Sequence, residues 1–156
     1  MTPHQIVATA LAKHAVIATA ESCTGGMVAA AITDISGSSA AFDRGFVTYS
    51  NVAKTQMLDV PLGLLETHGA VSEEVAIAMA QGALAHSNAT LAVSITGIAG
   101  PSGGSATKPV GLVHFACAAT IGQHWHEKMV FKGDRAAIRA AARDHALQML
   151  GKALAG

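Results

Sequence analysis

Aromatic residues and charge are both scarce in this sequence, and each shortage excludes a class of protein. Phe, Trp and Tyr make up 4% of the 156 residues, so a hydrophobic core has to be built from Ala, Val, Leu and Ile. Charged residues account for 13%, about half the usual share, and the formal net charge is zero. Because there is no basic excess, the chain offers no attractive field to nucleic acid or to an anionic membrane surface.

Cysteine and long apolar runs are also lacking. The two cysteines, Cys23 and Cys117, are too few for a disulfide framework, and they fit a reducing compartment. Residues 1–5 lack the charged start of a signal peptide, and no uncharged apolar run reaches the roughly 18 residues of a membrane span. We therefore expect a cytoplasmic protein. So little surface charge also favours a homo-oligomer, in which another subunit covers part of the surface.

Alternating helical and strand patterns predict a single domain, residues 1–156. The run ATLAVSIT at 89–96 is almost continuously apolar, which is typical of a central strand, and two strands around residues 121–122 read as a hairpin. We expect a three-layer α/β/α fold with a mixed, mostly parallel sheet. The predicted strands are 15–20, 44–50, 89–96, 110–120 and 123–131; the predicted helices start near residue 6 and cover 25–33, 51–58, 61–68 and 72–86, with a last one after residue 135.

The stretch AESCTGG, residues 20–26, joins a predicted strand to a predicted helix. Ser22 could be a nucleophile whose oxyanion is held by nearby backbone amides and by the positive end of the helix dipole. Alternatively, Ser22 or Thr24 simply caps the helix. Cys23 is a rival nucleophile, because a thiol at a helix N-terminus can have a lowered pKa, although it can equally be a small packing residue.

A serine nucleophile needs a base, and none of the eight histidines has a spacing that marks it as one. Lys54 is different, since it begins a helix shortly after the strand that carries Tyr49. A lysine buried in an apolar site can be neutral near pH 7 and accept the serine proton, and Tyr49 could relay or position that proton. The alternative is a solvated lysine and an ordinary strand tyrosine. His124 and His126 could form half a metal site, but no third ligand is evident, so we expect no metal.

The glycine-rich segment SITGIAGPSGGSATKPVG, residues 94–111, follows the strand predicted to be most buried. Ligands of open α/β sheets gather at the carboxyl ends of strands, where glycines let backbone amides approach a phosphate or a flat ring. The segment matches neither the phosphate-binding loop nor the dinucleotide fingerprint, so ATP and NAD are unsupported and no cofactor is expected. Arg44, Arg135 and the loop at 37–39 are further possible phosphate partners.

Five blocks in order, TAESCTGG, GSSAAFDRGFVTYSNVAK, HGAVSEEVA, SITGIAGPSGGSATKPVG and FKGDRAAIR, span nearly the whole chain. Together they closely resemble the CinA C-terminal domain family, in particular its stand-alone nicotinamide-nucleotide amidohydrolases. The resemblance implies hydrolysis of the carboxamide of nicotinamide mononucleotide to nicotinate mononucleotide and ammonia, within pyridine-nucleotide recycling.

The resemblance also assigns roles to residues of this chain. It implies that Ser22 is the nucleophile rather than only a cap, with Tyr49 and Lys54 handling the proton. The segment PSGGSAT departs slightly from the family, whose members often carry acidic residues before the equivalent of Lys108. The alternative is a catalytically silent nucleotide-binding module of the same fold. The expected substrate contacts are Cys23, Thr24, Gly25, Gly26, Ser38, Ser39, Gly97, Ala99, Gly100 and Arg135.

Overall fold

The computed structural model describes all residues, 1–156, as six α-helices, one short 3-10 helix and five strands. The strands are β1 (Ile17–Glu21), β2 (Phe42–Val47), β3 (Leu91–Gly97), β4 (Leu112–Ala119) and β5 (His124–Val130). The helices are α1 (Pro3–Ala12), α2 (Met27–Thr33), η1 (Ser38–Ala40), α3 (Asn51–Leu58), α4 (Leu62–His68), α5 (Glu73–Ala85) and α6 (Arg135–Ala155).

The strands form one mixed sheet in the order β2-β1-β3-β4-β5. β1 pairs in parallel with both β2 and β3, whereas β4 is antiparallel to β3 and to β5. Four of the five strands therefore run in one direction, which confirms the expected mixed, mostly parallel sheet. β3 lies in the middle, as its apolar run predicted, and the β4–β5 hairpin turns at Gly122, which has a φ of 86°.

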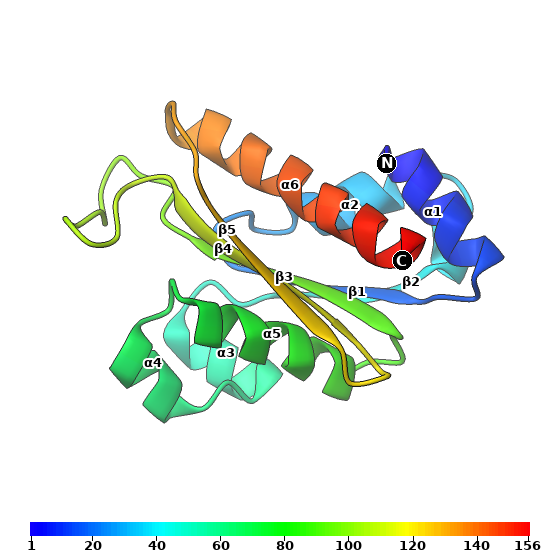
Figure 1. Ribbon diagram of the computed structural model, residues 1–156, viewed down its shortest axis with the longest axis horizontal. Coiled ribbons are helices and arrows are strands. Elements are labelled where there is room, and N and C mark those ends of the chain that lie inside the picture. The colour runs from blue at the N-terminus through cyan, green and yellow to red at the C-terminus, as the bar shows by residue number, and fades with distance from the viewer.

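Helices cover both faces of the sheet, so the predicted three layers are confirmed (Figure 1). α1, α2 and α6 pack on one face, and α3, α4 and α5 pack on the other. The larger core lies under α1, α2 and α6, and is built largely from aliphatic side chains of the helices and of β1, β3 and β4. A smaller, alanine-rich core lies under α5, where the side chains of β1 and β3 meet those of the helix. None of the helices combines the length and the apolar character needed to cross a membrane.

The start of α2 differs from the prediction, for a local reason. α2 begins at Met27 rather than at residue 25, because Gly25 and Gly26 adopt φ values of 57° and 105°, in the left-handed region that glycine tolerates. α3 begins at Asn51, as predicted, and is capped by Ser50, whose hydroxyl accepts from the Ala53 amide at 3.0 Å. Ser72 caps α5, with its hydroxyl 3.3 Å from the Val75 amide.

Candidate functional site

A buried serine and a buried lysine lie in direct contact at the carboxyl end of β1. The Lys54 Nζ atom is 3.0 Å from the Ser22 Oγ atom, although 31 residues separate them in the chain. Ser22 follows the last residue of β1, and its amide donates to the carbonyl of Ile95 in β3, which extends the sheet pairing by one residue. Lys54 sits one turn into α3, and 1% of its surface is exposed.

The surroundings of Lys54 suit a proton acceptor. Burial lowers the pKa of its ammonium group to about 8, with no carboxylate nearby to offset that effect, although Cys23 acts weakly against it. The Nζ atom donates to the carbonyls of Thr48 at 2.8 Å and of Tyr49 at 3.4 Å, in addition to its contact with Ser22. A neutral amine keeps two N–H groups for the two carbonyls, so its lone pair is left facing the Ser22 hydroxyl.

The turn between Ser22 and α2 is closed by short backbone bonds. The Gly25 amide donates to the Ser22 carbonyl at 3.0 Å, and the Met27 amide donates to the Thr24 carbonyl at 3.0 Å. The Cys23 amide, which directly follows the nucleophile candidate, donates to no backbone carbonyl. The amides of Thr24 and Gly26 are also without a backbone acceptor, but only Cys23 of these three residues lines the cavity beside Ser22, so its amide is the one best placed to receive a ligand oxygen.

The capping role considered for Ser22 and Thr24 belongs to Glu21 instead. Gly26 occupies the cap position of α2 and has no side chain to bond the helix. The Glu21 carboxylate, 1% exposed, accepts from the Val28 amide at 2.9 Å and from the Ala29 amide at 3.1 Å. The positive end of the α2 dipole therefore faces Glu21, so the expected help from this helix to an oxyanion at Ser22 is not available.

Cys23 is not an activated thiol. Burial raises its pKa to about 11, and the nearby Arg139 guanidinium only partly opposes that effect. At neutral pH the group is a thiol, which is a poor nucleophile compared with a thiolate. The packing interpretation of Cys23 is therefore the one that the structure favours.

The Tyr49 hydroxyl points to a different partner from the one expected. Arg135 Nη2 donates to it at 3.0 Å, while Arg135 Nη1 donates to the Gly100 carbonyl at 2.9 Å. Tyr49 reaches Lys54 only through its backbone carbonyl, and 62% of its surface is exposed. The hydrogen bonds thus join Ser22 to Lys54 and leave the Tyr49 hydroxyl with Arg135 at the rim.

A cavity of about 180 Å³ opens onto the Ser22–Lys54 pair. Its only charged lining side chains are Lys54 and Arg135, and no histidine lines it. The complete lining is Ser22, Cys23, Tyr49, Asn51, Lys54, Ala70, Val71, Thr96, Gly97, Ala99 and Arg135. Among the predicted substrate contacts, Cys23, Gly97, Ala99 and Arg135 reach this cavity, whereas Thr24, Gly25, Gly26 and Gly100 lie beside it without lining it.

Ser38 and Ser39 lie away from this cavity, which corrects their predicted role in phosphate binding. They form η1, which leads into the amino end of β2, and the Ala41 carbonyl that follows accepts from the Ile17 amide at the start of β1. β1 and β2 run in parallel, so the segment before β2 lies at the amino ends of these strands, whereas Ser22 lies at their carboxyl ends.

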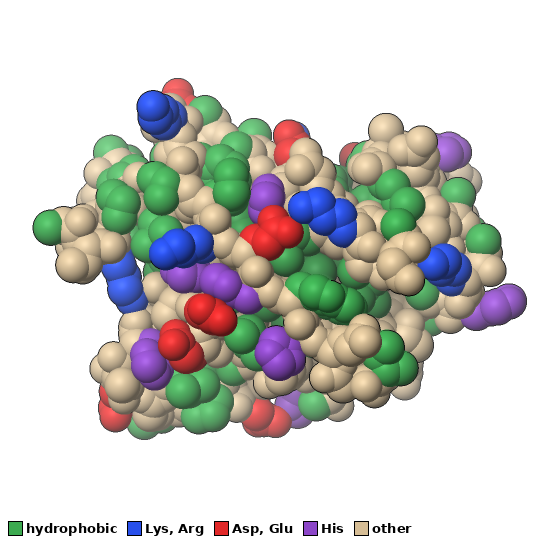
Figure 2. Space-filling view, viewed as in Figure 1, with side chains coloured by type: hydrophobic (Ala, Val, Ile, Leu, Met, Phe, Trp, Pro, Cys, Tyr) green, Lys and Arg blue, Asp and Glu red, His purple; other side chains and the backbone are tan.

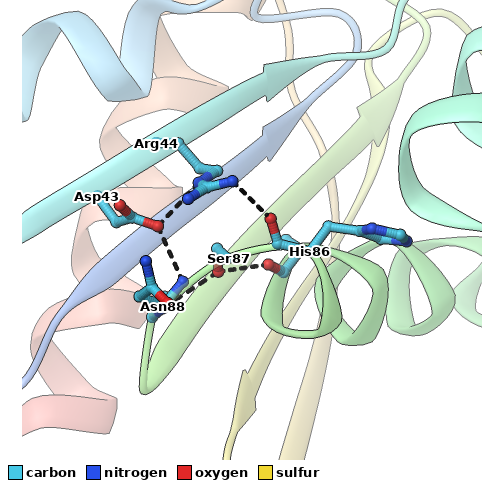
Figure 3. A network of polar contacts seen from close by, with 7 residues as sticks. Asp43, Arg44, His86, Ser87 and Asn88 are labelled. Atoms are coloured by element: carbon cyan, nitrogen blue, oxygen red, sulfur yellow. Dashed lines mark hydrogen bonds and ion pairs between the residues drawn. The ribbon is translucent and has the colours of Figure 1, made fainter.

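Arg44 also has a structural role rather than the phosphate contact considered for it (Figure 3). Its Nε atom lies 2.8 Å from the Asp43 carboxylate, and its Nη1 atom donates to the His86 carbonyl at 3.0 Å. The same carboxylate accepts from the Asn88 amide at 2.9 Å. This network ties the amino end of β2 to the loop after α5.

None of the histidines lines the cavity. His114 and His126 stack and hydrogen-bond to one another, with 2.9 Å between Nδ1 and Nε2, and burial lowers the pKa of His114 to about 4. His124 is exposed at the start of β5. No group of three His, Cys, Asp or Glu side chains is arranged to hold a metal ion.

A larger cavity, about 590 Å³, lies at the other end of the sheet, beside the amino end of β3 and the β4–β5 hairpin. Its walls include Cys117, Ile121, Trp125 and Lys152. It contains no paired nucleophile and base, and burial raises the pKa of Cys117 to about 12. The smaller cavity is therefore the candidate active site, because it contains the Ser22–Lys54 pair and the larger cavity has no such pair.

Sequence reasoning missed two charged residues that shape the site, Glu21 and Arg139. Glu21 stands within the quoted AESCTGG stretch, but nothing in the sequence shows that its carboxylate turns toward the start of α2. Arg139 donates from Nε to the Cys23 carbonyl at 2.9 Å and from Nη2 to the Thr24 carbonyl at 3.4 Å. Its spacing of four from Arg135 is the one signal that could have placed it on the same side of α6.

Fold and site together define a three-layer α/β protein with a serine–lysine pair, an arrangement that some serine hydrolases use in place of serine–histidine. The chain belongs to the CinA C-terminal domain family, whose profile matches residues 2–154.

Similar proteins support this membership at the level of sequence and of structure. The chain is 58% identical over 139 residues to the nicotinamide-nucleotide amidohydrolase PncC of Escherichia coli K12, covering 89% of this chain and 84% of that protein. It is 52% identical to a putative competence-damage inducible protein of Symbiobacterium thermophilum, of which it spans 35%. The crystal structure of the competence/damage inducible protein CihA from Agrobacterium tumefaciens superposes with a TM-score of 0.96 at 50% identity, covering 99% of this chain and 93% of that one.

Proposed function

We propose that this protein hydrolyses the carboxamide of nicotinamide mononucleotide, with Ser22 as nucleophile and Lys54 as base. The single observation that carries the proposal is the 3.0 Å contact between the Ser22 hydroxyl and a buried lysine amine. The printed name of the E. coli relative, at 58% identity, supports the choice of substrate.

The first half of the reaction forms an ester. Neutral Lys54 takes the hydroxyl proton of Ser22 as the oxygen attacks the carboxamide carbon, and the Cys23 amide receives the oxyanion. A well-placed donor of this kind contributes roughly 3 to 4 kcal/mol in comparable sites. Lys54 then returns its proton to the leaving nitrogen, so ammonia departs and the acyl group remains on Ser22.

The second half consumes water. Lys54 takes a proton from a water molecule that attacks the ester carbonyl, the C–O bond to Ser22 breaks, and the proton returns to the serine oxygen. The products are nicotinate mononucleotide and the free enzyme. The positive pyridinium ring withdraws electrons from the carboxamide carbon, which makes that carbon more electrophilic in the first attack and in the second.

The cavity fits one part of this substrate. Its volume of about 180 Å³ lies below the roughly 300 Å³ of typical whole-ligand pockets, so it suits the pyridine ring, with the ribose and phosphate extending past the rim. Arg135 lies at that rim, and no carboxylate lines the cavity to repel an anion. We assign Arg135 to the phosphate and Tyr49, whose hydroxyl it holds, to the ring or ribose. The exposed glycine-rich loop offers further amides near Gly97 and Ala99.

A catalytically silent nucleotide-binding module of the same fold is the alternative function. It would need the same cavity and Arg135, but it would not need a lysine desolvated against a serine hydroxyl. Burying an ammonium group without a counter-ion is costly, and a binding module gains nothing from that cost. The Ser22–Lys54 contact therefore favours the enzyme.

Ammonia release from nicotinamide mononucleotide tests the proposal. We expect Ser22→Ala to stay folded and to release no ammonia. Ser39 is exposed and lies at the other end of the strands, so Ser39→Ala is the control and keeps full activity. A panel with nicotinamide and other carboxamides defines the substrate. Binding of the mononucleotide without ammonia release by the wild-type protein would support the silent module instead.

Oligomeric state, compartment and metabolic role are further expectations for this protein. A homo-oligomer, action in the cytoplasm and a part in pyridine-nucleotide recycling are proposals that rest on composition and on family resemblance. The edge strand β5 and its hairpin carry several exposed apolar side chains, among them Ile121 and Trp125. Hydrophobic side chains also show among the charged ones on the face of the molecule seen in Figure 2. Molecular mass in solution, measured by light scattering, tests the homo-oligomer.

A further inference from the structure

The backbone turn that carries the nucleophile is held from behind by an arginine of α6. Arg139 donates from Nε to the Cys23 carbonyl at 2.9 Å and from Nη2 to the Thr24 carbonyl at 3.4 Å, so its planar guanidinium contacts two successive peptide groups. The fit is close, because a Cβ atom on Gly25 would lie 3.2 Å from Nη2. No carboxylate pairs with Arg139, so these carbonyls are its partners in the protein.

The position of these carbonyls governs the amides of the turn. In a trans peptide the C=O of one residue and the N–H of the next point in opposite directions. The Gly25 amide fixes the Ser22 carbonyl, and through that peptide the direction of the Cys23 N–H. Arg139 fixes the following peptide at the Cys23 carbonyl. Cys23 is thus held on both sides, while its amide donates to no backbone carbonyl and its residue lines the cavity.

Neither the sheet nor α2 donates a hydrogen bond to the Cys23 carbonyl. β1 ends at Glu21, and α2 begins only at Met27, whose amide donates to the Thr24 carbonyl, while the next two amides donate to the Glu21 carboxylate. Between those two residues the chain contains two glycines with positive φ, which by themselves leave the backbone free to change conformation. Arg139 is the side chain that connects this segment to α6.

We propose that Arg139 is a positioning residue for the amidase reaction, holding the turn of Ser22–Gly26 so that the Cys23 amide stays aimed at the oxyanion. This inference rests on the proposed function. It differs in kind from the role of Arg135, four residues earlier, which contacts Tyr49 and Gly100 at the rim and is assigned to substrate binding.

The two roles predict opposite kinetic changes. Misplacing a catalytic donor by about 1 Å can reduce the rate about 100-fold, so Arg139→Ala lowers kcat by that order and leaves KM little changed. Arg135→Ala raises KM. Arg139→Lys keeps a positive charge but loses the planar pair of donors, so it stays well below wild type. Arg143→Ala is the matched control, because Arg143 lies on the same helix and contacts only Asp144.

Chemical rescue separates positioning from general loosening of the fold. We expect millimolar guanidinium chloride to restore part of the kcat of Arg139→Ala, while sodium chloride at the same concentration does not. Unfolding temperatures are measured in parallel. A variant that keeps wild-type kcat, or that loses no more than Arg143→Ala, would overturn the proposal, as would a loss that guanidinium leaves unchanged.

A second readout does not depend on the substrate. A fluorophosphonate probe reacts with an activated serine and also develops negative charge on its oxygen, so its rate of attachment to Ser22, followed by intact mass, reports the same donor. We expect slower labelling in Arg139→Ala than in Arg143→Ala, with Ser22→Ala as the blank. If the wild type is labelled at Ser22 but releases no ammonia, the proposed substrate is wrong. The labelling rates still decide the role of Arg139 in that case. Equal rates in Arg139→Ala and Arg143→Ala would overturn the positioning role of Arg139.

Discussion

Replacing Lys54 with methionine should abolish activity and yet stabilise the protein, by an amount that depends on pH. Lys54 is 1% exposed, has no carboxylate partner, and has its pKa lowered to about 8 by burial. Methionine has a similar length and no charge, so Lys54→Met removes the cost of keeping an ammonium group away from water. Lost hydrogen bonds to Ser22 and Thr48 offset part of the gain at every pH.

The dependence on pH isolates the protonation of Lys54. Its pKa is about 8 when folded and about 10.4 when unfolded, so between these values the unfolded chain binds more protons. Stability of the wild type therefore rises as pH rises through this window, relative to a variant without the group. Linkage gives a change of about 2 to 3 kcal/mol between pH 7 and pH 10, which corresponds to a shift of several degrees in Tm for a domain of this size.

Thermal or urea unfolding of both proteins across this pH range measures the effect. We expect the stability advantage of Lys54→Met to be largest near pH 7 and to shrink toward pH 10. Lys132→Met, at an exposed lysine in the loop before α6, is the control and should show no such trend. A constant difference between wild type and Lys54→Met at every pH would mean that the buried amine is not destabilised, and the assignment of Lys54 as base would lose its physical basis.

Three further predictions follow from the same geometry. The value of kcat/KM should rise with pH up to about 8 and then level off, since only neutral Lys54 accepts a proton; a flat profile from pH 6 to 9 would contradict this role. Arg135→Ala should raise KM for nicotinamide mononucleotide more than for its dephosphorylated riboside, and an equal change for both would remove the phosphate contact. Glu21→Gln should lower the free energy of unfolding by about 1 to 3 kcal/mol, because one helix amide loses its carboxylate oxygen; urea unfolding against the exposed Glu66→Gln checks it.

Local patterns in the sequence predicted most of the fold. The almost continuously apolar run at 89–96 identified the central strand, because a strand covered on both faces has no solvent-facing side that would carry polar residues at alternate positions. The helix predicted at 72–86 is α5, which begins at Glu73 with Ser72 as its cap. The start of α2 was misplaced by two residues, since the double glycine reads as the beginning of a helix although its backbone is left-handed.

The candidate site was harder to predict, because it depends on which loops lie at the same end of the strands. Residues alone left Ser22 open between cap and nucleophile, and the family resemblance decided for the nucleophile, consistent with its contact to Lys54. The prediction for Ser38 and Ser39 was wrong because β1 and β2 pair in parallel, which puts their loop at the end of the strands opposite to Ser22. Arg139 was missed because its contacts are with backbone carbonyls, which carry no side-chain signature in the sequence.

Trapping the acyl-enzyme tests the central claim most directly. Wild-type protein mixed with nicotinamide mononucleotide and quenched in acid within one turnover should carry the acyl group of the substrate, minus ammonia, on the peptide that contains Ser22. Lys54→Met should carry none. An adduct on Cys23, or ammonia released at the wild-type rate by Ser22→Ala, would contradict the account.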